Sequence, residues 1–110
     1  MGLTKTEIFT KEQNKIATIA KVLGHPARVA ILQFLIKKQS CICGEIVDEI
    51  GLSQPTISQH LREMKNIGLI IGNIDGTKVC YCINHKKYNE IKEMFEQFFD
   101  KEILEQLEGC

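Results

Sequence analysis

The chain has no tryptophan, only two prolines and no net charge, because 14 lysines and arginines balance 14 aspartates and glutamates. It has no apolar run near the roughly 20 residues that a membrane-spanning helix needs, and no charged-then-apolar leader precedes a cleavage site. We therefore expect a cytoplasmic protein. Repeats, low-complexity segments and linkers are absent as well, so we expect a single domain over residues 1–110.

Residue sets that mark enzymes are also missing. The sequence has no recognisable Ser, His and Asp set, no paired carboxylates and no glycine loop of the kind that binds phosphate. We therefore predict that the chain is not an enzyme and requires no cofactor. Its five cysteines, an odd number without a secretion signal, favour thiols acting as ligands or redox groups over a disulfide framework.

The first part of the chain has the pattern of two helices, expected over about residues 11–38. Apolar residues recur at helical spacing up to Leu23, Gly24 stops this pattern, and Pro26 suits the first turn of a new helix. The second of these helices is apolar on most sides, which predicts that it is the most buried helix of the fold.

A helix-turn-helix is expected over residues 43–67. Gly51 suits the end of a short helix, while Ser53 and Pro55 favour the start of the next. Helical spacing gives this second helix a buried stripe, made of Ile57, Leu61 and Met64. Its other side carries polar groups suited to base edges and phosphates, and the candidate DNA-binding residues are Gln54, Pro55, Thr56, Ser58, Gln59, His60 and Arg62. An ordinary solvated helix face is the alternative interpretation.

A β-hairpin is expected directly afterwards, over residues 69–84. Residues 69–74 are strand-like, Asp75-Gly76 favours a two-residue turn, and residues 77–83 alternate as a returning strand. A helix-turn-helix followed by a hairpin is a winged helix, so the predicted fold class is mainly α with a small β-hairpin wing. Lys78 lies at the predicted wing tip, where it would contact a DNA backbone phosphate.

The last predicted helix, residues 86–108, has a wide apolar stripe that consists of Tyr88, Ile91, Phe95, Phe98 and Phe99. A terminal helix has little core of its own chain to cover, so we interpret the stripe, with the first helix, as a homodimer surface. A two-fold dimer with one reading helix per chain would bind an inverted repeat in double-stranded DNA. Residues 1–85 carry ten basic and seven acidic side chains, against four and seven in residues 86–110, which suits a last helix facing away from DNA.

Several of these segments together resemble a known family. They are Leu23-Gly24-His25-Pro26-Ala27-Arg28, residues 53–61, Gly68-Leu69 and the strand at residues 76–83. In combination they resemble the ArsR/SmtB family of metal- and metalloid-responsive bacterial repressors, over nearly the whole chain. The resemblance implies a dimeric winged helix that binds operator DNA and is released when it captures an effector ion.

Two Cys-x-Cys pairs, residues 41–43 and 80–82, are the candidate binding site for the effector. In a winged helix the extended segment before the helix-turn-helix usually pairs with the second wing strand. Side chains alternate across a sheet, so Ile42 would point inward together with Val79, Tyr81 and Ile83. The outer face would then gather the thiols of Cys41, Cys43, Cys80 and Cys82, a set suited to Zn, Cd, Pb or As(III). The first hypothesis is therefore a repressor that leaves its operator when such an ion binds these thiolates.

Other interpretations of the cysteines stay open. They could be small buried residues without chemistry, or they could sense oxidants or persulfides by pairing on the same scaffold. A winged helix that binds only other proteins is a further alternative. Ile46 stands where arsenic-sensing relatives carry a third cysteine, while Glu96 and Phe99 stand where a second family site has His and Glu. We therefore expect no zinc site on the last helix, a surface or capping role for His85, and no ligand role for Cys110.

Overall fold

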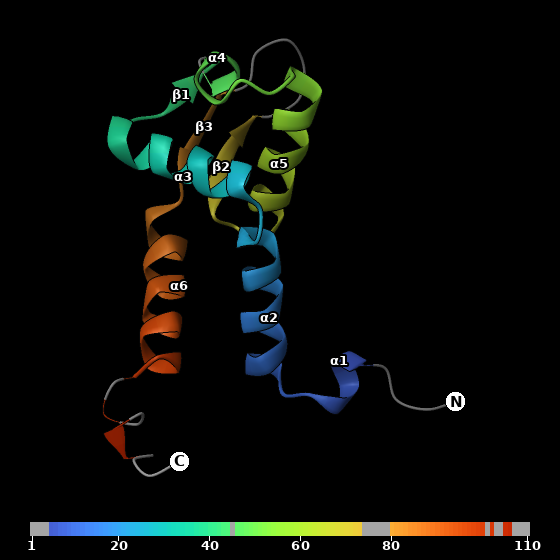
Figure 1. The fold of residues 1–110 in the computed structure, drawn as a ribbon, viewed down its shortest axis with the longest axis vertical. Coiled ribbons are helices and arrows are strands. Elements are labelled where there is room, and N and C mark those ends of the chain that lie inside the picture. The colour runs from blue at the N-terminus through green and yellow to red at the C-terminus, as the bar shows by residue number, and fades with distance from the viewer. Residues whose placement is uncertain (1–4, 45, 74–79, 101, 103–104, 107–110) are drawn as a thin grey trace.

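The fold is a set of helices around a small antiparallel sheet. The computed structural model describes residues 5–44, 46–73, 80–100, 102 and 105–106. The elements are α1 (Lys5–Ile8), α2 (Lys11–Leu23), α3 (Pro26–Lys38), β1 (Ile42–Cys43), α4 (Ile46–Ile50), α5 (Gln54–Asn66), β2 (Ile70–Asn73), β3 (Cys80–Ile83) and α6 (His85–Phe98). Helices α3 to α5 and the sheet form one body, and α2 and α6 both extend from the same side of it (Figure 1).

Local sequence signals explain most helix boundaries. The Thr10 side chain accepts the Gln13 backbone N–H at 3.0 Å and the Gln13 side chain accepts the Thr10 N–H at 3.0 Å, which is a capping box at the start of α2. Helix α2 ends at Gly24, and α3 begins with Pro26 in its first turn. The predicted pair of N-terminal helices over residues 11–38 is therefore confirmed.

The sheet has the strand order β1–β3–β2, with both pairs antiparallel. Ile42 lies opposite Tyr81, and Ile70 lies opposite Ile83, which confirms the predicted pairing of the segment before α4 with the second wing strand. Gly72 adopts φ +140°, and a Cβ added there would collide with the Cys80 carbonyl oxygen. Only glycine therefore allows β2 to approach β3 at this point.

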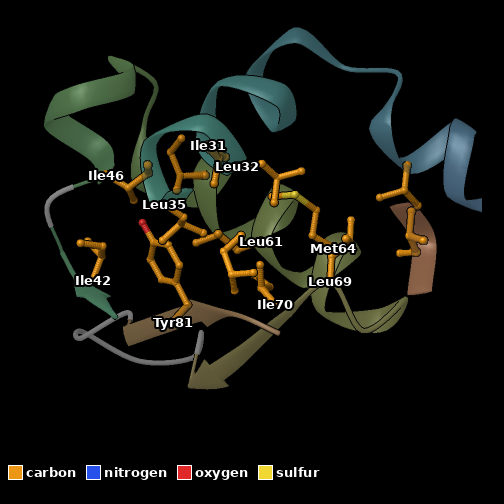
Figure 2. Packing of buried hydrophobic residues seen from close by; sticks show 14 of the residues in the cluster. Ile31, Leu32, Leu35, Ile42, Ile46, Leu61, Met64, Leu69, Ile70 and Tyr81 are labelled. Atoms are coloured by element: carbon orange, nitrogen blue, oxygen red, sulfur yellow. The ribbon is translucent and has the colours of Figure 1, made fainter. Parts of the chain in front are cut away.

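The core lies between α3, α5 and the inner face of the sheet. Figure 2 shows the Tyr81 ring among side chains from α3, α4 and α5, and it is fully buried. The predicted α5 stripe of Ile57, Leu61 and Met64 is no more than 1% exposed at any position. On α3 the most buried apolar side chains are Ile31, Leu32 and Leu35, as expected for the central helix.

The structure differs from the sequence prediction at both ends. The one-turn helix α1 was not predicted. The last helix ends at Phe98, before the predicted residue 108, and its first residue is His85 instead of residue 86. The predicted Asp75-Gly76 turn, Lys78, Val79 and Cys110 lie outside the described residues.

The overall shape is elongated. The radius of gyration is 16.9 Å, whereas a compact domain of about 100 residues has about 13 Å. The excess comes from α2 and α6, which extend away from the body (Figure 1). Across the described residues, a single helix long and apolar enough to span a membrane does not occur; α2 and α3 meet that criterion only as a pair bent by 87°.

Candidate functional site

The turn between α4 and α5 has the hydrogen bonds of a helix-turn-helix. The Gly51 N–H donates to the Val47 carbonyl at 2.9 Å, and Gly51 adopts φ +83°, which closes α4 as predicted. Ser53 occupies the N-cap of α5, and its carbonyl accepts the Ile57 N–H at 3.0 Å. The Ser53 hydroxyl bonds to the Thr56 hydroxyl at 3.0 Å instead of capping a backbone N–H.

Most of the predicted DNA-binding residues lie on the exposed face of α5. Gln54, Pro55, Thr56, Gln59 and Arg62 are all exposed. The Gln59 side-chain amide donates to the Glu63 carboxylate at 3.2 Å, one helical turn further on. This bond uses one N–H of the amide, so the second N–H and the side-chain oxygen of Gln59 can still contact a base.

Ser58 does not lie on that face, so its predicted exposure is wrong. Its exposed fraction is only 7%. Ser58 precedes Leu61 by three residues, so the two side chains are neighbours on the helix surface, and the small Ser58 is covered together with the apolar stripe. The hydroxyl therefore faces the packed side of α5 and not a DNA groove.

His60 is half-buried and is held by a residue from another helix. The Arg28 Nε–H donates to His60 Nδ1 at 2.9 Å, and the ring of His25 lies 5.6 Å from that of His60. Burial, then the Arg28 guanidinium and then His25 lower the pKa of His60 below its ordinary value. The role of Arg28 was not predicted from the sequence; the available signal was one guanidinium in the first turns of an otherwise apolar helix.

The cysteines come together where the sequence predicted. Cys43 lies opposite Cys80 across β1 and β3, and Ile42 and Tyr81 between the two pairs are buried. Cys41 and Cys82 form the adjacent pair, with Cα atoms 4.4 Å apart, while those of Cys43 and Cys80 are 4.1 Å apart. Cys41 and Cys43 are exposed, and their partners are half-buried. All four therefore lie on the outer face of the sheet, opposite the core.

The state of these cysteines differs from the predicted set of four free thiols. They form two disulfides, Cys41–Cys82 and Cys43–Cys80. With the sulfurs paired in this way, no group of three or more His, Cys, Asp or Glu side chains among the described residues is arranged to hold a metal ion. Disulfide sulfurs are not the thiolate ligands that soft ions need, so ion binding would require reduction first.

The start of α6 agrees with the expectation for His85. The Asn84 side chain accepts the Lys87 backbone N–H at 3.2 Å and so caps the helix, while His85 is exposed. Glu96 and Phe99 are exposed near the other end of α6.

The apolar stripe of α6 is only partly covered within the chain. Ile91 is buried, and Tyr88 and Phe95 are half-buried, whereas Phe98 and Phe99 are 59% and 65% exposed. An open hollow of about 1060 Å³ lies along this stripe, with a lining that includes Leu23 of α2, Leu32 of α3 and Tyr88, Ile91, Phe95 and Phe99. The structure therefore leaves an apolar surface on the part of the molecule where α2 and α6 extend.

The chain is similar to known transcriptional regulators. The family described as "Bacterial regulatory protein, arsR family" matches residues 25–71. An uncharacterised HTH-type transcriptional regulator of Methanocaldococcus jannaschii is 35% identical over 88 residues, covering 79% of this chain and 98% of that protein. The arsenical resistance operon repressor of Staphylococcus xylosus is 32% identical over 79 residues, covering 72% of this chain and 75% of that protein.

A solved structure confirms the fold. An ArsR family transcriptional regulator matches with a TM-score of 0.69 and 16% sequence identity, over 88% of this chain and 97% of that chain. The predicted winged helix is therefore shown.

Proposed function

The chain belongs to the ArsR family of DNA-binding transcriptional repressors, and on this premise we propose that the thiol state of its four sheet cysteines sets its affinity for operator DNA. In the proposal, the protein with free thiols represses, and formation of Cys41–Cys82 and Cys43–Cys80 releases it. The observation that carries the proposal is the opposition of the four cysteines across two strands, each next to its redox partner.

The location of these pairs gives the switch a short physical route. β1 leads directly into α4, which packs against the reading helix α5. β3 belongs to the wing and also pairs with β1. Two covalent bonds between β1 and β3 fix the wing relative to the segment before α4, so that wing and reading helix can no longer adjust together to the DNA grooves.

The chemistry requires only a small oxidant, such as a low-molecular-weight disulfide. The thiolate of one cysteine attacks this disulfide, forms a mixed disulfide and releases one thiolate. The opposed cysteine then attacks the mixed disulfide, which forms the protein disulfide and releases the second thiolate. Cys41 and Cys43 are exposed and are therefore the candidates for the first attack.

Capture of a thiophilic ion is the second candidate function of the same residues. It is favoured by the similarity to a protein named as an arsenical resistance operon repressor. When reduced, the four cysteines offer a soft ligand set for As(III), Cd, Pb or Zn on one face of the sheet. Ion affinity would fall at low pH, because protons compete for the thiolates.

The proposed reader of the operator is the exposed face of α5, with Lys78 contacting phosphate from the wing. Gln54, Thr56, Gln59 and Arg62 supply polar groups, with Pro55 beside them, and His60 lies at the edge of this face. The proposed assembly is a homodimer through α2 and α6, whose apolar surface is described above. One reading helix per protomer would then meet two half-sites about one helical turn apart.

Paired serine variants test the thiol proposal. The two variants are Cys41→Ser with Cys82→Ser and Cys43→Ser with Cys80→Ser, and Cys110→Ser is the matched control. We expect a low-molecular-weight disulfide to release operator DNA from the parent and from the control, and to release less or none from the paired variants. Equal release from all of them contradicts the switch. Arsenite and cadmium, added to the reduced proteins, test the second candidate in the same assay.

A further inference from the structure

Arg28 is a buried cation that connects three helices. Its side chain lies near the start of α3 and is only 8% exposed. Its Nη1–H donates to the Val22 carbonyl at 3.0 Å, and its Nε–H donates to His60 Nδ1 on α5 at 2.9 Å. A buried guanidinium without such partners would be strongly destabilising, so these two bonds determine where Arg28 can lie.

The turn between α2 and α3, here called the α2–α3 corner, needs a hydrogen-bond donor for the Val22 carbonyl. In a continuing helix this carbonyl would accept the N–H of residue 26, but that residue is Pro26, which has no N–H. The carbonyl at the end of α2 therefore lacks a donor within the helix, and the Arg28 guanidinium supplies one. The Nε–H of the same guanidinium donates to His60, which lies in the middle of α5.

The bond to His60 fixes the form of its imidazole. Nδ1 accepts a hydrogen bond from Arg28, so in the neutral ring the proton must be on Nε2. Protonation of Nδ1 would direct an N–H at the guanidinium and break the bond. The lowered pKa of His60, caused by burial, Arg28 and His25, favours the neutral form.

We propose that Arg28 is a positioning residue for operator recognition, which holds α5 against the α2–α3 corner through a neutral, Nε2-protonated His60. The proposal rests on α5 being the reading helix, but not on the thiol switch. It follows that protonation of His60 frees α5 from this corner and weakens operator binding.

The sign of the pH dependence follows from the groups around His60. Arg28 on α3 and His25 before α3 both lower its pKa, whereas the acidic side chains of α4 and α5, Asp48, Glu49 and Glu63, are not among the causes. A lowered pKa keeps His60 neutral above the ordinary value of about 6.5, and the bond is lost as the pH falls through the lowered value. A His60 that instead bonded a DNA phosphate would show the opposite sign, with tighter binding on acidification.

The first arm of the test is an imidazole ¹H–¹⁵N NMR spectrum of the reduced, full-length protein without DNA. We expect His60 of the parent to be the Nε2–H tautomer. In Arg28→Met we expect its pKa to rise, because the guanidinium is gone. An Nδ1–H tautomer in the parent overturns the proposal even if Arg28→Met does not fold.

The second arm measures operator affinity of the reduced proteins at about pH 8 and at a pH below the His60 midpoint that the NMR titration of the parent gives. The result for each variant is the ratio of the two affinities. The parent should lose about fivefold or more of its affinity on acidification. His60→Asn has an amide oxygen bonded to Cγ, as Nδ1 is in histidine, so it can still accept the Arg28 bond. It cannot be protonated in this range, so its ratio should be near one. His25→Gln is the matched control and should keep most of the loss.

An unchanged or higher affinity of the parent at the acid pH, or a loss retained by His60→Asn, overturns the proposal. If the parent does not bind operator DNA even at about pH 8, the proposed operator-binding function fails, and the NMR arm still decides whether Arg28 holds His60.

Discussion

At the scale of single residues, the exposed face of α5 combines several donors and acceptors on a rigid helix. Gln59 and Arg62 are exposed and three positions apart in the sequence, so they lie side by side on the helix surface. An amide can bond adenine and a guanidinium can bond guanine, each in a bidentate manner. These two side chains are therefore the strongest candidates for base contacts.

Replacing either residue should weaken specific binding. We expect Gln59→Ala or Arg62→Ala to lower operator affinity by about 1–3 kcal/mol for each lost base contact. Lys78→Ala should instead weaken binding to all DNA sequences alike, because phosphates carry no sequence information. Fluorescence anisotropy with operator and unrelated DNA measures both effects, and Lys86→Ala, at an exposed position of α6, controls for loss of a charge. Unchanged operator affinity in both α5 variants would show that another surface reads the DNA.

Single residues also show how far the sequence could predict this site. Helical spacing identified the stripe of Ile57, Leu61 and Met64, but spacing does not say how wide the packed side is, and so Ser58 was assigned to the wrong face. The bond from Arg28 to His60 joins residues 32 apart in the chain. No local pattern contains such a contact, because it exists only once α3 and α5 have packed.

At the scale of elements, the sheet brings the cysteines together, and its register was predictable. Alternation of side chains places Ile42 and Tyr81 inward, which puts Cys41, Cys43, Cys80 and Cys82 outward. Whether those cysteines are free or paired depends on redox conditions, which a sequence does not contain. The pattern therefore predicted the place of the site but not its oxidation state.

The close approach of β2 to β3 depends on Gly72. We expect Gly72→Ala to lower the free energy of unfolding by about 1–3 kcal/mol, or more, because its Cβ meets the Cys80 carbonyl. Gly44→Ala is the matched control: Gly44 also has a positive φ, of +78°, but nothing lies within 4 Å of an added Cβ. Urea unfolding of both reduced variants measures the difference, and an equal loss in the two would show that the contact with β3 is unimportant.

At the scale of the whole molecule, the extended shape suggests a second copy. Helices α2 and α6 leave the body. Exposed Ile8 and Phe9 precede α2, and exposed Phe98 and Phe99 lie at the end of α6. Burial of such side chains contributes about 25 cal/mol for each Å² removed from water. A symmetric partner that covers both helices would therefore complete the fold as well as supply the second reading helix.

A charge on this surface should separate the protomers. We expect Phe98→Glu to shift the protein from dimer to monomer in analytical ultracentrifugation, and to weaken operator binding, because each protomer then binds only one half-site. Ile36→Glu is the control, since Ile36 is 45% exposed but lies on α3, near the sheet cysteines. A parent protein that sediments as a monomer at micromolar concentration would contradict the proposed dimer.

The central claim is that pairing of the sheet cysteines releases the repressor from DNA. One redox titration tests it most directly, with operator binding measured by anisotropy and each cysteine pair measured by differential alkylation and mass spectrometry in the same samples. We predict that affinity for the operator falls as Cys41–Cys82 and Cys43–Cys80 form, with a shared midpoint, and returns on reduction. Full operator affinity in samples where both disulfides are complete would contradict the account.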